Sequence, residues 1–188
     1  MIIRGLMLGI VLTFYSAYFI KAVLLARRGI RVNFLGEREK AKEIVLFEKL
    51  LRTATVAGGI VQFISPFFSK PGPLLLSILG LGIACLGTGI FIVAVRTMQN
   101  NWRVGFSEGQ ETELVTKGIY QYSRNPAFVG FDCLYIGMAL VFPNILTISL
   151  AIGAMLLFHL QINQEEAYLA AEFGENYRDY QQKVRKYF

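Results

Sequence analysis

The sequence contains little of what most enzymes use for catalysis. It has one histidine, two cysteines, and no stretch that matches a glycine-rich phosphate loop or a nucleophile elbow. Cys85 and Cys133 lie in apolar stretches without a histidine nearby, so we expect packing thiols and neither a disulfide nor a zinc site. These absences exclude most classes of soluble enzyme and predict no bound metal.

Hydrophobic residues are abundant instead. They make up 54% of the 188 residues, and the mean hydropathy is +0.48, values typical of integral membrane proteins. A helix needs roughly 20 mostly apolar residues to cross about 30 Å of hydrocarbon. We therefore predict an all-α, polytopic integral membrane protein of a single domain, with about five transmembrane helices over residues 5–26, 44–68, 73–95, 127–142 and 145–162.

The connections between the predicted spans differ greatly in length. Only Pro143-Asn144 joins the last two spans, which indicates a tight helical hairpin, whereas the loop over 96–126 has a length typical of functional loops. A C-terminal helix over 164–188 is expected to continue out of the bilayer, with a break at Gly174. The first span is too long for a signal peptide and lacks a small-residue cleavage site, so we interpret it as a helix.

Basic residues predict the orientation. Of the 19 lysines and arginines, all but three follow the first span, follow the third span or lie in the C-terminal tail; the exceptions are Arg4, Lys21 and Lys70. The positive-inside rule then places the N-terminus outside and the C-terminus in the cytoplasm, in the inner or plasma membrane if the source is prokaryotic. Anionic lipid headgroups account for the net charge of +6, so no nucleic-acid partner is predicted.

Small residues follow a four-residue spacing in the third span. They lie at Gly80, Ala84 and Thr88, and again at Cys85 and Gly89. Such spacing lets two helices approach closely in lipid, so we expect a packing face here and no chemistry.

Asp132 is the one carboxylate well inside a predicted span. An ionisable group at that depth is costly unless it is paired or hydrated, which makes a functional role the default hypothesis. It shares a helical face with Asn125, Phe128 and Tyr135. The alternative is an ion pair that only locks helices together, with Lys21, Lys49 or Arg52 as its partner.

A second group of candidates lies around the end of the fifth span. His159 is the only histidine, and Glu165 and Glu166 follow it within two turns of helix. A single histidine near a helix end is more often structural than catalytic, and paired glutamates usually form a solvated face. If a substrate amine has to lose a proton, however, Glu166, Asp132 or His159 could accept it.

Two polar runs flank the predicted hairpin, one before the fourth span and one after the fifth. Together they predict a polar pocket at the cytoplasmic membrane face, beside a bundle of apolar helices. Such a pocket suits a water-soluble cofactor that meets a lipid-like substrate, and the residue pattern alone leads no further.

These runs resemble the membrane methyltransferase family that contains isoprenylcysteine carboxyl methyltransferases and phospholipid N-methyltransferases. The resemblance covers roughly the last 90 residues. Three blocks in order carry it: Leu114-Val115-Thr116-Lys117-Gly118-Ile119-Tyr120, then Arg124-Asn125-Pro126-Ala127-Phe128-Val129-Gly130, then Glu165-Glu166 with Phe173-Gly174-Glu175-Asn176-Tyr177-Arg178-Asp179-Tyr180.

The resemblance implies an enzyme that binds S-adenosyl-L-methionine in a cytoplasmic pocket. Thr112 to Val115, which includes Leu114, would hold the adenosyl part together with Tyr120. The stretch Arg124-Asn125-Pro126-Ala127-Phe128 would line the methionine end, and Glu165 would contact the cofactor from the final helix. A prenylated or acyl-chain substrate, from the protein or lipid pool of the membrane, would enter laterally between helices.

This sequence departs from the family pattern at three positions. The family histidine is Asn125 here, the following tyrosine is Phe128, and an arginine that reads the substrate carboxylate corresponds to Gln161. Glutamine cannot form the charged bidentate clamp that arginine offers a carboxylate. The expected function is therefore a methyltransferase acting on a lipophilic, isoprenoid or lipid-like substrate. The alternatives are a non-catalytic membrane protein of this fold and an NADPH-dependent reductase of the same superfold, and no oligomeric state is predicted.

Overall fold

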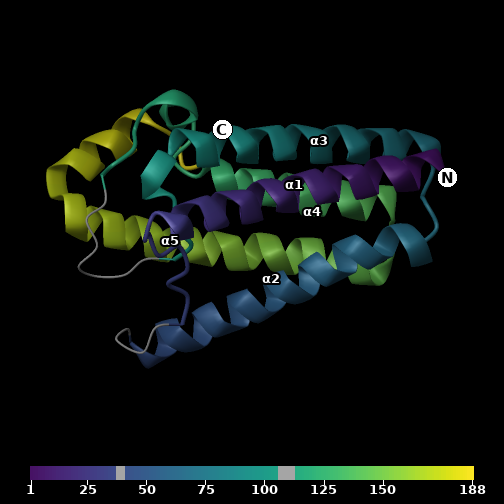
Figure 1. Ribbon diagram of the computed structural model, residues 1–188, viewed down its shortest axis with the longest axis horizontal. Helices are drawn as coiled ribbons and strands as arrows, with labels where there is room; N and C mark the ends of the chain where they lie inside the picture. Colours follow the sequence, from purple (N-terminus) through teal and green to yellow (C-terminus); the bar gives the residue numbers. More distant parts are fainter. Residues whose placement is uncertain (37–40, 106–112) are drawn as a thin grey trace.

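The computed structural model describes residues 1–36, 41–105 and 113–188, which form a bundle of five helices. The helices are α1 (Ile2–Arg27), α2 (Lys42–Phe68), α3 (Leu74–Thr97), α4 (Pro126–Val141) and α5 (Ile145–Lys183). Two short 3₁₀ helices, Gln99–Asn101 and Gly118–Gln121, lie between α3 and α4. Figure 1 shows α1, α3, α4 and the first part of α5 side by side, whereas α2 diverges from them toward its N-terminal end.

Each predicted span coincides with one of these helices, and the all-α membrane architecture is confirmed. Among the described residues, α1, α3 and α5 are long and apolar enough to cross a membrane, and α4 is a shorter apolar helix of 16 residues. Helix α2 has 27 residues but begins with a charged stretch that includes Glu43, Lys49 and Arg52, which lowers its hydropathy.

Reciprocal glycine contacts bring α3 and α4 together. A Cβ atom built on Gly137 would lie 2.5 Å from the carbonyl oxygen of Gly80, and one built on Gly130 would lie 2.8 Å from that of Gly87. Gly80, Ala84 and Thr88 are buried, so the first of the two predicted small-residue rows is the packing face. The second row points elsewhere, since Cys85 is exposed and a Cβ atom on Gly89 would meet nothing within 4 Å.

An aromatic cluster joins α1 to this pair. The rings of Phe14 and Phe91 stack with centroids 4.3 Å apart, and Phe131 meets Phe14 edge-on at 4.8 Å. Toward the C-terminal end of α1, Tyr18 packs edge-on against Trp102 at 5.2 Å. Such offset and edge-to-face pairs stabilise packing beyond the area they bury, so this cluster fixes α1 against α3 and α4.

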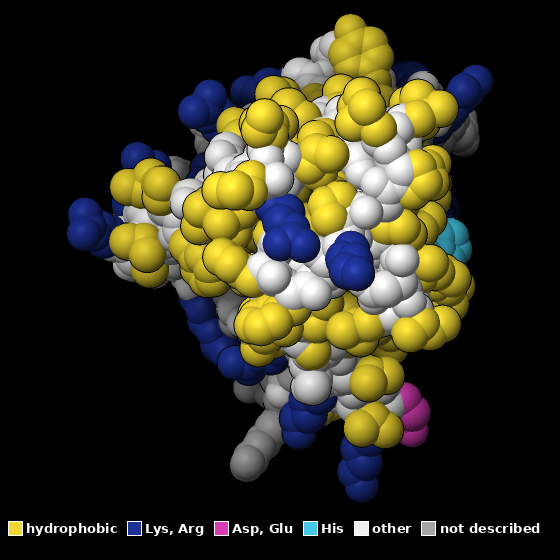
Figure 2. Space-filling model, turned by 90° about the vertical axis from the view of Figure 1, so that its right-hand side faces the viewer, with side chains coloured by type: hydrophobic (Ala, Val, Ile, Leu, Met, Phe, Trp, Pro, Cys, Tyr) yellow, Lys and Arg dark blue, Asp and Glu magenta, His cyan; other side chains and the backbone are white. Residues whose placement is uncertain are grey.

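Polar bonds close the end of the bundle where α1 begins. The Arg4 guanidinium donates to the carbonyl of Ser69, and the Asn144 amide donates to the Ser69 hydroxyl, at 3.0 and 3.4 Å. Asn144 also caps α5 reciprocally with Thr147, which confirms the tight hairpin after Pro143. Figure 2 looks onto this end, where apolar side chains surround a small basic patch. Arg4 and Lys70 are the basic residues that the sequence places at this end of the bundle.

Helix α5 continues past its apolar part, as predicted, and is kinked at Gly174, the predicted break. That residue has φ 54 and ψ −124, a conformation that favours glycine because it carries no Cβ atom. The helix ends at Lys183 and not at residue 188 as predicted, because the last residues turn back toward α4. Residues 184–188 therefore lie against the start of α4 (Figure 1). This return places the C-terminal tail beside the polar run that precedes α4.

We expect Gly137→Ala to destabilise the bundle. The added methyl group would clash with the Gly80 carbonyl and the Ala84 side chain, and overpacking of this kind costs roughly 1–3 kcal/mol. Thermal unfolding in detergent, followed by circular dichroism, measures the effect. Gly153→Ala is the matched control, because its Cβ atom meets nothing within 4 Å, and it should be neutral or slightly stabilising. Equal unfolding temperatures for the two variants would contradict the packing argument.

Candidate functional site

A large, mostly apolar cavity lies among α1, α2, α4 and α5. Its volume is about 580 Å³. The wall is built largely from aliphatic and aromatic side chains, among them Phe19, Val56, Ile60, Phe63, Phe131 and Phe158. One end carries polar groups, namely Asn33, Arg52, Arg103, Gln161 and Glu165. We call this space the apolar cavity; its shape and lining suit a lipophilic chain with a polar head.

A second cavity, of about 130 Å³, lies between the segment before α4 and the second half of α5. We call it the α5 cavity. It combines aromatic rings, carboxylates and guanidinium groups, from Tyr120, Tyr168, Phe173, Tyr177, Glu113, Glu165, Arg103 and Arg124. This mixture differs from the apolar cavity and suits a polar ligand with an aromatic part.

The two cavities share one stretch of wall. Arg103, Gly105 and Glu165 line both of them. A ligand in the α5 cavity and a lipophilic ligand in the apolar cavity would therefore meet at Glu165. This meeting point is the central feature of the site.

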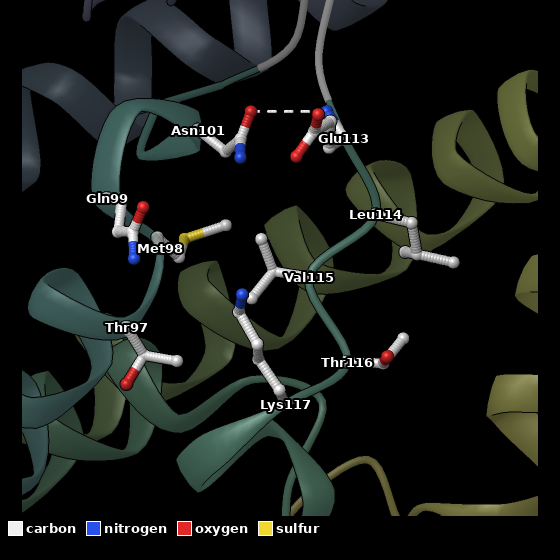
Figure 3. Close-up of a pocket in the computed structure, with 9 residues that line it drawn as sticks. All are labelled: Thr97, Met98, Gln99, Asn101, Glu113, Leu114, Val115, Thr116 and Lys117. Carbon is white, nitrogen blue, oxygen red and sulfur yellow. Dashed lines mark hydrogen bonds between the residues drawn. The ribbon is translucent and has the colours of Figure 1, made fainter.

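A third cavity, of about 160 Å³, extends the α5 cavity on the side of α3 (Figure 3). We call it the loop cavity. Figure 3 shows residues 113–117 facing Thr97 to Asn101 across it, and the Asn101 side-chain oxygen accepts a hydrogen bond from the backbone N–H of Glu113 at 3.1 Å. It shares Met98, Asn101, Glu113, Leu114 and Val115 with the α5 cavity.

Backbone hydrogen bonds join the segment that follows α1 to the segment that follows α3, beside the cavities. The N–H of Phe34 donates to the carbonyl of Val104 at 2.9 Å, and the N–H of Val104 donates to that of Val32 at 2.8 Å. The buried Glu48 accepts a hydrogen bond from the N–H of Gly36 at 2.7 Å, which ties the first segment to α2. Phe34 lines the α5 cavity and Val104 the apolar cavity, so one short pairing supports both.

An ion pair joins the polar run before α4 to the middle of α5. The Arg124 guanidinium donates two hydrogen bonds to the Glu166 carboxylate, at 3.0 and 3.1 Å, and the Asn125 amide donates a third at 3.0 Å. Burial alone would raise the pKa of Glu166, but these hydrogen bonds and the charges of Arg124 and Lys186 hold that pKa below its ordinary value. Glu166 is thus an ionised, almost buried anchor.

The C-terminal tail completes this anchor. The backbone N–H of Arg124 donates to the carbonyl of Arg185 at 2.9 Å, and its guanidinium donates to the carbonyls of Gln181 and Val184. Ser123 and Asn125 both donate to the carbonyl of Lys186, at 3.3 and 3.2 Å. We call the assembly of Arg124, Glu166, Asn125 and residues 184–186 the clasp.

Tyrosines line the floor of the α5 cavity as protonated hydroxyls. Tyr180 donates to the carbonyl of Tyr120 at 2.6 Å. Burial raises the pKa of Tyr180 to about 12 and raises that of Tyr120 as well. Both hydroxyls therefore remain hydrogen-bond donors at neutral pH.

The structure gathers five of the predicted cofactor residues at one place. Leu114, Val115, Tyr120, Arg124 and Glu165 all line the α5 cavity. Thr112 lies outside the described residues.

The remaining predicted residues lie elsewhere. Phe128 and Gln161 line the apolar cavity. Asn125 and Glu166 belong to the clasp, and Pro126 forms the first turn of α4.

Asp132 and His159 line none of the three cavities. His159 forms a hydrogen bond of 2.7 Å with the Tyr187 hydroxyl, and one Asp132 oxygen has no hydrogen-bond partner among the described residues. Among the described residues, Asp132 forms no ion pair with Lys21, Lys49 or Arg52, the three predicted helix-locking partners.

Arg103 and Asn33 also line the site, although the sequence had not indicated them. Each comes from a connecting segment without a local motif, and the pairing of Phe34 with Val104 brings them together. The aromatic residues of α5 carried a usable signal, because Phe173 and Tyr177 belong to the third motif block.

Residues 75–176 match the family model described as phospholipid methyltransferase. The chain belongs to this family. The family predicted from the three sequence blocks is thereby confirmed, and the matched range contains all of α4 and most of α5.

Individual members of the family are similar to this chain over part of their length. The protein-S-isoprenylcysteine O-methyltransferase of Schizosaccharomyces pombe is 33% identical over 55% of this chain and 45% of its own. The enzyme of the same name from Homo sapiens is 32% identical over 58% of this chain and 39% of its own. The chain thus spans less than half the length of these two relatives.

A solved structure shows the same fold. The eukaryotic intramembrane Ras methyltransferase, an isoprenylcysteine carboxyl methyltransferase, superimposes with a TM-score of 0.61. The superposition covers 92% of this chain and 61% of that one, at 24% sequence identity.

We expect Arg124→Ala to destabilise the protein by about 3–5 kcal/mol, because it leaves the buried Glu166 carboxylate without its bidentate partner. Thermal unfolding in detergent measures the loss. Arg124→Lys should recover part of it, since lysine keeps the charge but not the paired geometry. The control is Arg178→Ala, which removes an exposed arginine from α5. Equal stability of Arg124→Ala and the control would show that the clasp is not needed.

The lowered pKa of Glu166 predicts a specific loss of stability in acid. Since the folded state binds this proton more weakly than the unfolded state, the contribution is complete above about pH 4.3 and is lost as the pH falls through the lower folded value. Thermal unfolding temperatures across pH 3–7 should fall less steeply in acid for Glu166→Gln than for the natural protein. Parallel curves would rule out Glu166 as the titrating group.

Proposed function

We propose that this protein is a membrane-embedded methyltransferase that uses S-adenosyl-L-methionine to methylate a lipophilic, isoprenoid or lipid-like substrate. The observation that carries the proposal is the shared wall at Glu165, where a polar cavity meets a large apolar one. Membership in the phospholipid methyltransferase family supports the same activity.

The residues of the α5 cavity fit this cofactor. An adenine ring can stack on Tyr168 or Phe173, ribose hydroxyls can donate to Glu113, and the amino-acid end needs both a cation and an anion, which Arg103 and Glu165 provide. Ligand sites commonly measure about 300–1,000 Å³. The α5 cavity and the loop cavity are each far smaller, and together, at about 290 Å³, they come close to the lower end of that range. We therefore assign both to the cofactor, since they share five lining residues.

When bound, the cofactor supplies a methyl group on a positively charged sulfonium. The protein's contribution is positioning, because an in-line displacement depends on the alignment of the two reactants. Gln161 donates a hydrogen bond of 2.9 Å to Glu165, which orients this carboxylate at the shared wall. Within the clasp, Glu166 and Arg124 hold α5 and the segment before α4 in place, so we propose Glu166 as a positioning residue.

For the membrane arrangement we propose five spans, with the N-terminus outside and the C-terminus in the cytoplasm. Helices α2 and α4 would cross together with the three longer apolar helices, because all five run between the same two ends of the bundle (Figure 1). The end with Arg4 and Lys70 would face outward, and the richly basic end with the three cavities would face the cytoplasm.

Calorimetric titration of the detergent-purified protein with S-adenosylhomocysteine tests this proposal. We expect saturable binding, weakened about tenfold or more in Glu165→Gln, because a hydrogen bond to a charged group contributes about 1.5–3 kcal/mol. Glu172→Gln is the matched control, as it makes the same change at an exposed position of α5.

Binding with methyl transfer to farnesylated acceptors would support the methyltransferase. A folded protein that does not bind S-adenosylhomocysteine would contradict the proposal, and titration with NADPH would then test the reductase alternative.

A further inference from the structure

Gln161 has an unusual environment at the polar end of the apolar cavity. It lies on α5, its side chain lines the cavity, and only 1% of its surface is exposed. Its side-chain nitrogen donates to the Glu165 carboxylate at 2.9 Å. This bond determines which way the amide points, because a rotated amide would bring its own oxygen against a carboxylate oxygen, and both atoms are acceptors.

The other end of the amide is the informative one. The Gln161 side-chain oxygen accepts no hydrogen bond from any residue that the structure describes. A buried acceptor without a donor is unfavourable, and native proteins rarely retain one without a reason. Since the side chain lines a cavity large enough for a lipophilic ligand, a donor carried by that ligand would satisfy it.

The charges nearby determine what kind of head group fits. Next to the Gln161 oxygen lies the Glu165 carboxylate, so a ligand head here faces two acceptors. A carboxylate head would be repelled, whereas an O–H or N–H group would be bound by both. Two arginines also line this end. Arg103 is the cation assigned above to the cofactor, and its Nη1 donates to the carbonyls of Asn100 and Trp102, whereas Arg52 is an exposed residue of α2.

We propose that Gln161 is a specificity-determining residue that selects substrates with a hydrogen-bond-donating head. The substrate is then a lipophilic chain that ends in a hydroxyl or an amine, and a chain ending in a free carboxylate is disfavoured. This proposal rests on the proposed function, because it identifies the apolar cavity as the substrate site.

Binding of three C15 probes tests it: farnesol, farnesylamine and farnesoic acid, which present a hydroxyl, an amine and a carboxylate on the same carbon skeleton. Dissociation constants are measured for the detergent-purified protein, without methyl transfer. We expect the natural protein to bind the first two about tenfold more tightly than the acid, as the gain or loss of one hydrogen bond beside a charged group predicts. Gln161→Leu should reduce this preference severalfold, and Gln161→Arg should favour the acid.

The matched control is Asn176→Leu, which removes an exposed amide from α5 and should leave the preference unchanged. Titration with S-adenosylhomocysteine on the same samples verifies that each variant is folded and separates the two proposals. If the natural protein binds S-adenosylhomocysteine but prefers the acid, shows no preference or binds none of the probes, the inference about Gln161 is wrong. An unchanged preference in Gln161→Leu would overturn it as well. In each case the proposed function would still stand. If the folded natural protein does not bind S-adenosylhomocysteine, the proposed function is overturned instead.

Discussion

The buried ion pair between Arg124 and Glu166 is the contact on which the site depends. It joins three parts of the chain that are far apart in sequence: the segment before α4, the middle of α5 and the C-terminal tail. Successive residues on a helix point about 100° apart. Because Glu166 is held in the clasp, Glu165 is turned toward the two cavities. One glutamate therefore determines the direction of the other, and the pair functions as a unit.

The remainder of the bundle combines tight and loose packing. Glycine contacts hold α3 against α4 at distances that no larger residue allows, and the aromatic cluster adds α1 to that pair. Helix α2 instead diverges from its neighbours, and the apolar cavity lies on its inner side (Figure 1). A rigid core of three helices thus supports a cavity whose outer wall is the least closely packed helix. This division lets the site remain ordered beside a space that accepts a flexible chain.

Local signals explain what the sequence predicted well. Apolar runs predicted each helix, Pro143-Asn144 predicted the hairpin, and three motif blocks predicted the family and five residues of the α5 cavity. The separate environments of Glu165 and Glu166 could not be predicted, because they depend on the rotation of α5 about its own axis. That rotation is fixed by the tail, and the contact of Arg124 with Val184 spans 60 residues. The role of Arg103 could not be predicted for a similar reason, because only the pairing of two segments distant in sequence brings this residue to the wall of the cavities.

The wall formed by Arg103, Gly105 and Glu165 has a consequence for inhibition. Because the apolar cavity and the α5 cavity share this wall, a single molecule that joins a nucleoside to an alkyl chain can occupy both. Once one half of such a molecule is bound, the other half is present at an effective concentration in the millimolar range when the linker is short. Selectivity for this protein over other methyltransferases would then arise from the length of the linker, because the linker must span the wall between these two cavities.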